Sequence, residues 1–198
     1  CEKEKSRKIV LHVTALFRDE EDDPKGGGYI LKLAERMKEE NVLFLIAGKS
    51  ELASNTALSQ NVVLLGNIRD QNQLAAYYNK ADLTVIASRR ETYSMICAES
   101  LCCGTPVVGF KAGAPETISI PDYSEFVEYG DLDSLQKCIE KWLNYADKSN
   151  KQKISQQAIE KYNRVRMVKR YKKIYNELLS VRSNQTGSGK NGNEKVFG

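Results

Sequence analysis

The chain has 198 residues, of which 41% are apolar and 28% charged. This composition suits a packed core and excludes disordered and collagen-like classes. No apolar run approaches the ~20 residues that span a bilayer, and the charged first residues are not typical of a signal peptide. The net charge of +4 is unevenly spread. Residues 1–150 carry 18 basic and 23 acidic side chains, whereas residues 151–182 carry 10 and 2.

Five cysteines and one histidine are the soft metal-ligand candidates, and their spacing does not indicate a metal site. The cysteine count is odd, and no C-x-x-C pair occurs. We therefore expect reduced, structural cysteines, which are typical of the cytoplasm. His12 falls within a predicted strand, where a hydrogen-bonded histidine of the core or the sheet end is the favoured interpretation.

Apolar runs rich in β-branched residues alternate with segments of helical spacing. Strands are predicted at 8–13, 42–47, 62–65, 83–87 and 106–110, and helices at 29–40, 71–80, 94–103 and 132–144. Such alternation with short connections predicts a Rossmann-like, doubly wound parallel sheet. Ligands of these sheets bind at the carboxyl ends of the strands, so the loops at those ends are the candidate site.

Three regions are expected along the chain. Residues 1–150 form the α/β domain, residues 151–182 a basic C-terminal segment of one or two amphipathic helices, and residues 183–198 a flexible tail rich in Gly, Ser and Asn.

Lys25 stands before three glycines at a strand-loop-helix junction, although neither G-x-x-x-x-G-K-[ST] nor G-x-G-x-x-G occurs. One interpretation is a phosphate clamp, in which the ammonium lies beside free N–H groups of a helix start. The other is a solvated lysine in a glycine-rich turn. The spacing does not choose between them.

Glu91 precedes a predicted helix that is unusually apolar, and Glu99 lies within it. A carboxylate there is costly unless hydrogen-bond donors meet it, and sugar hydroxyls are such donors. A glycosidase pair is a competing interpretation. Eight helical residues span about 12 Å, whereas glycosidase carboxylates lie roughly 5–9.5 Å apart, which argues against simple hydrolysis.

The sequence S88-RR-E91-TYSMICA-E99-SLCCGTPVVGFKAGAPE116 resembles the E-x7-E region of retaining glycosyltransferases of family four, in the GT-B superfamily. Lys25-Gly26, Ala47-Gly48 and Leu65-Gly66-Asn67-Ile68 resemble other family positions in order and spacing. The similarity covers about residues 8–180 and is closest to bacterial capsule and exopolysaccharide enzymes. It implies the C-terminal, donor-binding half of a GT-B fold, followed by C-terminal helices.

The resemblance also implies site roles. Glu91 would be catalytic, contacting the transferred sugar and supporting charge near its anomeric carbon, while Lys25 would hold the donor diphosphate. Glu99 would accept hydrogen bonds from the ribose. The remaining implied contacts are the backbone N–H groups of Tyr93, Ser94 and Met95 for the distal phosphate, and Gly48 and Ile68 beside the base.

Two features depart from the family pattern. Ser94 occupies a position where the family usually has glycine, and the loop before Lys25 is strongly acidic. No metal and no cofactor are implied, because the UDP- or GDP-linked sugar donor is itself a substrate.

The implied function is transfer of a hexose to a glycan or lipid-linked acceptor in polysaccharide biosynthesis, in the cytoplasm or at the inner face of the membrane. The acceptor would bind an amino-terminal domain that this chain lacks, so the isolated domain is expected to be inactive. The basic segment would pack on that domain, form a solvated face or contact anionic lipid. Alternatives are a non-catalytic nucleotide-binding module and a GT-B sugar-nucleotide epimerase. Binding of nucleic acid is not expected.

Overall fold

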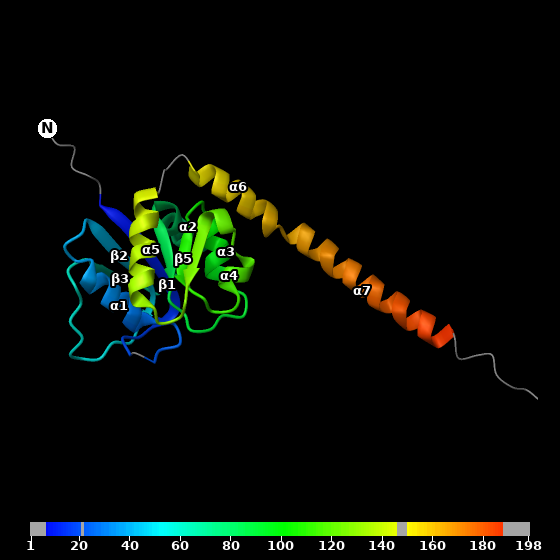
Figure 1. Cartoon of the computed structure of the whole chain (residues 1–198), viewed down its shortest axis with the longest axis horizontal. Coiled ribbons are helices and arrows are strands. Elements are labelled where there is room, and N and C mark those ends of the chain that lie inside the picture. The colour runs from blue at the N-terminus through cyan, green and yellow to red at the C-terminus, as the bar shows by residue number, and fades with distance from the viewer. Residues whose placement is uncertain (1–6, 21, 146–149, 188–198) are drawn as a thin grey trace, which may run out of the picture. The chain divides into compact units, whose positions relative to one another are not determined.

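A parallel six-stranded sheet is the centre of the computed structural model, which describes residues 7–20, 22–145 and 150–187. The strand order is β3-β2-β1-β4-β5-β6, and each neighbouring pair is parallel. Figure 1 labels four of the strands, β1, β2, β3 and β5. The strands are β1 (Lys8–Phe17), β2 (Val42–Ser50), β3 (Val62–Gly66), β4 (Leu83–Ile86), β5 (Val107–Phe110) and β6 (Ser124–Val127). The predicted doubly wound, Rossmann-like sheet is confirmed.

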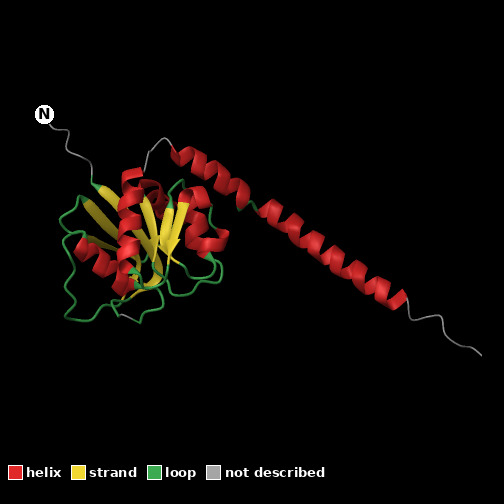
Figure 2. Cartoon of the chain, viewed as in Figure 1, coloured by secondary structure: helices red, strands yellow, loops and turns green. Residues whose placement is uncertain are grey.

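Helices flank the sheet in Figure 2. They connect successive strands except β2 and β3, which are joined by a loop. They are α1 (Gly27–Arg36), α2 (Gln71–Lys80), α3 (Met95–Cys102), the short α4 (Pro115–Ile118), α5 (Leu132–Tyr145), α6 (Lys151–Lys161) and α7 (Arg164–Gly187), with a 3₁₀ turn at Pro121–Tyr123. The Asp70 carboxylate begins α2 by accepting hydrogen bonds from the backbone N–H groups of Asn72 and Gln73.

Successive strand residues point to opposite faces of the sheet, and this alternation divides the core in two. Val10 faces the larger cluster, which contains Ile30 and Leu33 of α1 and Leu135 of α5. Leu11, the next residue, faces a smaller cluster together with Tyr78 and Ala81. Helices α1 and α5 therefore cover one face of the sheet, and α2 covers the other.

Differences from the predicted elements concern boundaries and one strand. β1 continues to Phe17 and β2 to Ser50, and their register shifts between Val13 and Leu16. β6 was not predicted, because a four-residue strand with only its first residue fully buried carries too little periodic signal.

The C-terminal boundaries also differ. The compact unit of the fold extends to Ile159 instead of residue 150, because Ile154 and Ala158 of α6 are buried. Helix α7 continues to Gly187, five residues into the predicted tail, since no proline or glycine interrupts it before that point. Residues 188–198 of that predicted tail lie outside the described residues.

Cys97, Cys102, Cys103 and Cys138 are reduced and form no disulfide; Cys1 lies outside the described residues. His12 is a buried sheet histidine, as expected, with its Nδ1 3.1 Å from the carbonyl oxygen of Val85. Its Nε2 has no partner within the described part of the chain. Burial lowers the pKa of His12 to about 4, so the ring is neutral at physiological pH.

Candidate functional site

The strand order reverses between β1 and β4, which creates a topological switch point. At such a point the loops after two adjacent strands turn in opposite directions and leave a crevice. The loops after β1 and β4 are joined by a hydrogen bond of 2.9 Å from the N–H of Arg89 to the carbonyl of Pro24. Gly26 permits this approach: its φ is 74°, and a Cβ there would lie 2.2 Å from the carbonyl oxygen of Ala87.

Lys25 and Glu91 meet across this switch point. The Lys25 Nζ donates to Glu91 Oε1 at 2.8 Å, with side-chain exposures of 38% and 12%. An ammonium and a carboxylate from the two switch-point loops thus lie side by side, although they are 66 residues apart in the chain. The fold brings together the two charged residues that the family resemblance implies for diphosphate and sugar.

The start of α1 beside Lys25 is already occupied by an anionic group. The buried carboxylate of Asp23 accepts from the N–H groups of Lys25 and Gly27, both at 3.2 Å. The expectation of an ammonium beside free helix N–H groups therefore does not hold for Gly27, the first residue of α1, because Asp23 accepts from its N–H. Any anion held here would meet the Lys25 side chain, because Asp23 takes those two backbone donors.

Glu91 is held in place by a turn that follows β5. Its N–H donates to the carbonyl of Ala112 at 2.9 Å, and it forms an isolated parallel bridge with Gly113. The turn is closed by Glu116, whose carboxylate accepts from the N–H groups of Ala112 and Gly113 at 3.1 and 2.8 Å. Burial opposes ionisation of Glu116, but the backbone donors outweigh it and hold the pKa below its ordinary value.

The start of α3 lies shortly after Glu91 and is strained. Ser94 precedes the helix with φ 65° and ψ 76°, and it is the only non-glycine residue with positive φ among the described residues. Its side chain is buried, and its Oγ has no partner there. Tyr93 and Met95 are 47% and 58% exposed. Within the described ranges, the N–H groups of Tyr93, Ser94 and Met95 have no acceptor, as an anion-binding helix start requires.

Glu99 lies one turn into α3, half-buried, where its Oε2 accepts from the hydroxyl of Tyr78 at 3.2 Å. Gly48 and Ile68 lie elsewhere, toward the ends of the neighbouring strands β2 and β3. Gly48 is buried, and a Cβ there would lie 2.2 Å from the carbonyl oxygen of Thr14. Ile68 is half-buried in the loop between β3 and α2.

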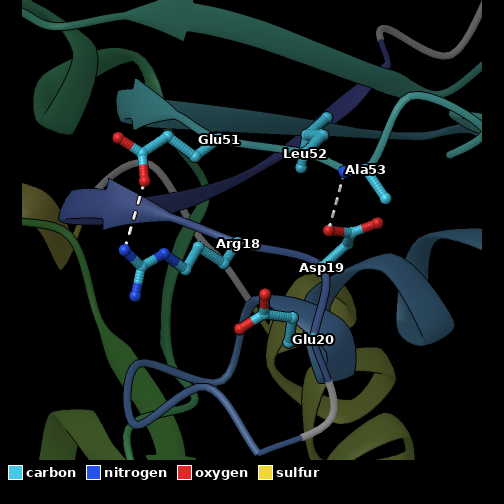
Figure 3. Close-up of a pocket in the computed structure, with 6 residues that line it drawn as sticks. All are labelled: Arg18, Asp19, Glu20, Glu51, Leu52 and Ala53. Atoms are coloured by element: carbon cyan, nitrogen blue, oxygen red, sulfur yellow. Dashed lines mark hydrogen bonds and ion pairs between the residues drawn. The ribbon is translucent and has the colours of Figure 1, made fainter.

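A pocket of about 550 Å³ opens between the loops that follow β1 and β2 (Figure 3). Arg18 pairs with Glu51 at 3.1 Å, and Asp19 accepts from the N–H of Ala53 at 3.2 Å. None of the predicted site residues lines this pocket. Its three carboxylates outnumber the one guanidinium, which disfavours a diphosphate. The lining residues are Arg18, Asp19, Glu20, Glu51, Leu52 and Ala53.

Sequence reasoning missed three residues of the site: Asp23, Tyr78 and Glu116. Asp23 lies three residues before the N-cap of α1, Gly26, so the usual preference for aspartate at the N-cap does not single it out. Tyr78 and Glu116 carried no usable signal, since their partners are set by packing. No cluster of three or more His, Cys, Asp or Glu side chains is placed to hold a metal ion in residues 7–20, 22–145 and 150–187.

The fold and the candidate site together define the class of protein: a Rossmann-like α/β domain with polar groups gathered at its switch point. The chain matches the family description "Glycosyl transferases group 1" over residues 2–162. This match covers most of its length, and the protein belongs to that family.

Curated relatives are distant and longer than this chain. It is 27% identical over 107 residues to a D-inositol 3-phosphate glycosyltransferase of Xylanimonas cellulosilytica, covering 50% of this chain and 26% of the relative. It is 24% identical over 132 residues to an N-acetyl-alpha-D-glucosaminyl L-malate synthase of Bacillus anthracis, covering 65% and 34%. An uncharacterised 41.2 kDa protein in the cps region of Klebsiella pneumoniae is 25% identical over 177 residues, covering 88% and 49%. The chain therefore spans about half or less of each relative.

Solved structures show the same fold. Sucrose-phosphate synthase from Thermosynechococcus elongatus superposes with a TM-score of 0.67 at 21% identity, over 88% of this chain and 46% of that one. Anabaena HepE, solved in complex with UDP, gives 0.69 at 17% identity, over 87% and 49%. The fold is thus the Rossmann-like architecture of GT-B glycosyltransferases.

Proposed function

We propose that this chain is the nucleotide-sugar donor-binding domain of a retaining glycosyltransferase. The enzyme transfers a hexose from a UDP- or GDP-linked donor to a glycan or lipid-linked acceptor in polysaccharide biosynthesis. The observation that carries the proposal is the Lys25–Glu91 pair at the switch point, immediately before a helix start with unpartnered N–H groups. A cation and backbone donors suit a diphosphate, and a carboxylate suits a sugar.

In this proposal, binding rearranges the Lys25–Glu91 pair. Lys25 Nζ turns to the donor diphosphate, and the N–H groups of Tyr93, Ser94 and Met95 bind the distal phosphate, which stabilises the charge of the departing nucleotide. Glu91 is then free to accept hydrogen bonds from the transferred sugar and to stabilise positive charge near its anomeric carbon. Glu99 accepts from the ribose hydroxyls, and Gly48 and Ile68 lie beside the base. The chemistry is positioning and electrostatic stabilisation, without a metal and without a protein nucleophile in this domain.

The acceptor belongs to a part of the protein beyond this domain, and the isolated domain is therefore proposed to bind donor without transferring sugar. Helix α7 supports contact with a further surface, because its apolar side chains recur at spacings of three and four residues, as in Met167, Tyr171, Ile174 and Leu178, and all are exposed. That surface is an amino-terminal acceptor domain or, with the basic residues of the helix, an anionic membrane at the cytoplasmic face. No helix in the described ranges combines the length and apolar character of a membrane span.

Calorimetric titration of the chain with UDP, GDP and ADP tests the proposal. We expect one of the three to bind, and the Glu99→Ala variant to bind it less tightly while its circular dichroism spectrum and melting temperature stay close to those of the wild type. If folded wild-type protein binds none of the three nucleotides, the proposal is rejected.

Two alternatives predict different products. A non-catalytic nucleotide-binding module would bind the nucleotide but transfer no sugar even in the full-length protein. A sugar-nucleotide epimerase of the same fold would release an altered sugar or sugar nucleotide and no glycosylated acceptor. Product analysis with the full-length protein separates both from the proposed transferase.

A further inference from the structure

Tyr78 connects the buried core to the candidate ribose site. Its ring is 1% exposed and packs with Leu11, Leu45 and Ala81 on the α2 face of the sheet. Its hydroxyl reaches out of this cluster to α3, where it donates to Glu99 Oε2 at 3.2 Å. The hydroxyl of a core tyrosine thus contacts the carboxylate that the proposed function assigns to the ribose.

The position of this hydroxyl is set by contacts at both ends of the residue. The backbone carbonyl of Tyr78 accepts a hydrogen bond of 2.6 Å from the hydroxyl of Thr105, which follows α3 in the chain. The ring cannot change rotamer without displacing the buried side chains around it. The phenol is consequently a rigid donor, whereas Glu99 is a half-buried side chain with three rotatable bonds.

The protonation state agrees with a donor role. Burial, reinforced by the negative charge of Glu99, raises the pKa of Tyr78 well above its ordinary value. The phenol therefore keeps its proton at any physiological pH and donates a hydrogen bond to the carboxylate. Among the described residues, Tyr78 is the donor to Oε2 and no donor engages Oε1. One carboxylate oxygen is held and the other remains available for a ligand hydroxyl.

We infer that Tyr78 is a positioning residue, which holds the Glu99 carboxylate so that its second oxygen accepts from the ribose hydroxyls of the nucleotide. This inference rests on the proposed function, because it requires a nucleotide in the site. The bond of 3.2 Å is longer than the usual ~2.7–2.8 Å for O–H···O, so its loss has a moderate effect on binding.

The test compares two ligands in two variants. Tyr78→Phe removes the hydroxyl and keeps the ring. Tyr77→Phe, at the preceding residue of α2, is the matched control. Each protein is titrated with UDP, GDP and ADP, and then with the 2′,3′-dideoxy form of the diphosphate that binds most tightly. Tyr78→Phe is expected to raise the Kd of the ribonucleotide about fivefold and to leave the Kd of the dideoxynucleotide within about twofold. Tyr77→Phe should change neither.

A double variant identifies the route of the effect. In a Glu99→Ala background, Tyr78→Phe should have no further effect on the ribonucleotide, because the group it positions is gone. Equal weakening of both nucleotides by Tyr78→Phe would mean a general packing role and would overturn the inference, as would an unchanged Kd for both. If wild-type protein binds none of the three diphosphates, the proposed function itself fails and this inference fails with it.

Discussion

At the scale of single residues, the site depends on charges that compensate one another before any ligand arrives. Lys25 neutralises Glu91, and Asp23 occupies the N–H groups at the start of α1. Asp23 also explains how an acidic loop can precede a lysine that is proposed to bind phosphate. Its buried carboxylate accepts from the N–H groups of Lys25 and Gly27, so part of the loop's negative charge faces backbone donors and not the proposed ligand.

Replacing Lys25 by alanine should weaken binding of the nucleoside diphosphate about tenfold or more, because a charge-assisted contact to the diphosphate is lost. Binding of the corresponding nucleoside, which has no phosphate, should stay unchanged in an NMR titration. Lys38→Ala is the control, since Lys38 is also a partly exposed, ion-paired lysine but lies beyond α1. Equal loss of nucleoside and diphosphate affinity would contradict the assigned role.

Ser94 is a second case in which one residue decides local energetics. A side chain in the left-handed region costs about 1–2 kcal/mol, and its buried hydroxyl has no partner in the described part of the chain. Glycine removes both costs but adds chain entropy to the unfolded state, about 0.5–1 kcal/mol. Ser94→Gly should therefore raise the free energy of unfolding by about 1 kcal/mol.

Urea denaturation measures this effect, with Ser94→Ala as the comparison variant. Alanine removes the hydroxyl but keeps the strained backbone, so it should stabilise the protein less than glycine does. If alanine stabilises it as much as glycine, the cost lies in the hydroxyl and not in the backbone.

At the scale of elements, the turn between β5 and α4 supports the loop that carries Glu91 without contributing a proposed ligand contact. Glu116 closes the turn on the N–H groups of Ala112 and Gly113, and the carbonyl of Ala112 in turn accepts from the N–H of Glu91. The loop after β4, the turn after β5 and α4 itself are therefore one hydrogen-bonded unit, and its integrity depends on the ionised carboxylate of Glu116.

This dependence predicts a pH effect on stability. The pKa of Glu116 is lower in the folded state than in the unfolded chain, so its contribution is fully present above the unfolded pKa of about 4.3 and decreases as the pH falls through the folded value. Denaturation of wild type and Glu116→Gln should show the larger stability difference at neutral pH, with the two converging in acid. A difference that does not depend on pH would contradict the prediction.

At the scale of the whole molecule, the two C-terminal helices behave differently. α6 belongs to the compact unit: Lys151 donates to the carbonyls of Asn79 and Ala81, and Ser155 to the carbonyl of Cys102. α7 belongs to the second compact unit, from Glu160 onward. The boundary between the units falls near the end of α6, so a truncation there removes the second unit and leaves the first.

A chain ending at Asn163 should keep its melting temperature within about 2 °C of the full chain and its affinity for the nucleoside diphosphate. A chain ending at Tyr145 also loses α6, with Ile154, Ala158 and the Lys151 hydrogen bonds, and should be destabilised by about 3 kcal/mol or more. Thermal melts of the two truncations measure the contrast, and loss of nucleotide binding on removal of α7 alone would contradict the assignment.

Most of the sheet, and the sheet edge that carries the candidate site, could be predicted because both follow from short stretches of sequence. The apolar runs of β2 and β4 and the period of α2 appear in a few consecutive residues, and the rule of the switch point then places Lys25 and Glu91 at one edge. The presence of β6 and the full length of β1 were not predicted, because their pairing depends on neighbouring strands more than on their own residues.

The amino-acid sequence by itself thus determined the order of strands and helices, the family resemblance and the loops that carry charge. Only the tertiary structure decided which distant groups satisfy one another: Lys25 donates to Glu91 from 66 residues away, and Tyr78 donates to Glu99 from 21 residues away. The reason is physical. Secondary structure follows the short periods of helix and strand, whereas the partner of a buried polar group is set by the packing that excludes water from it.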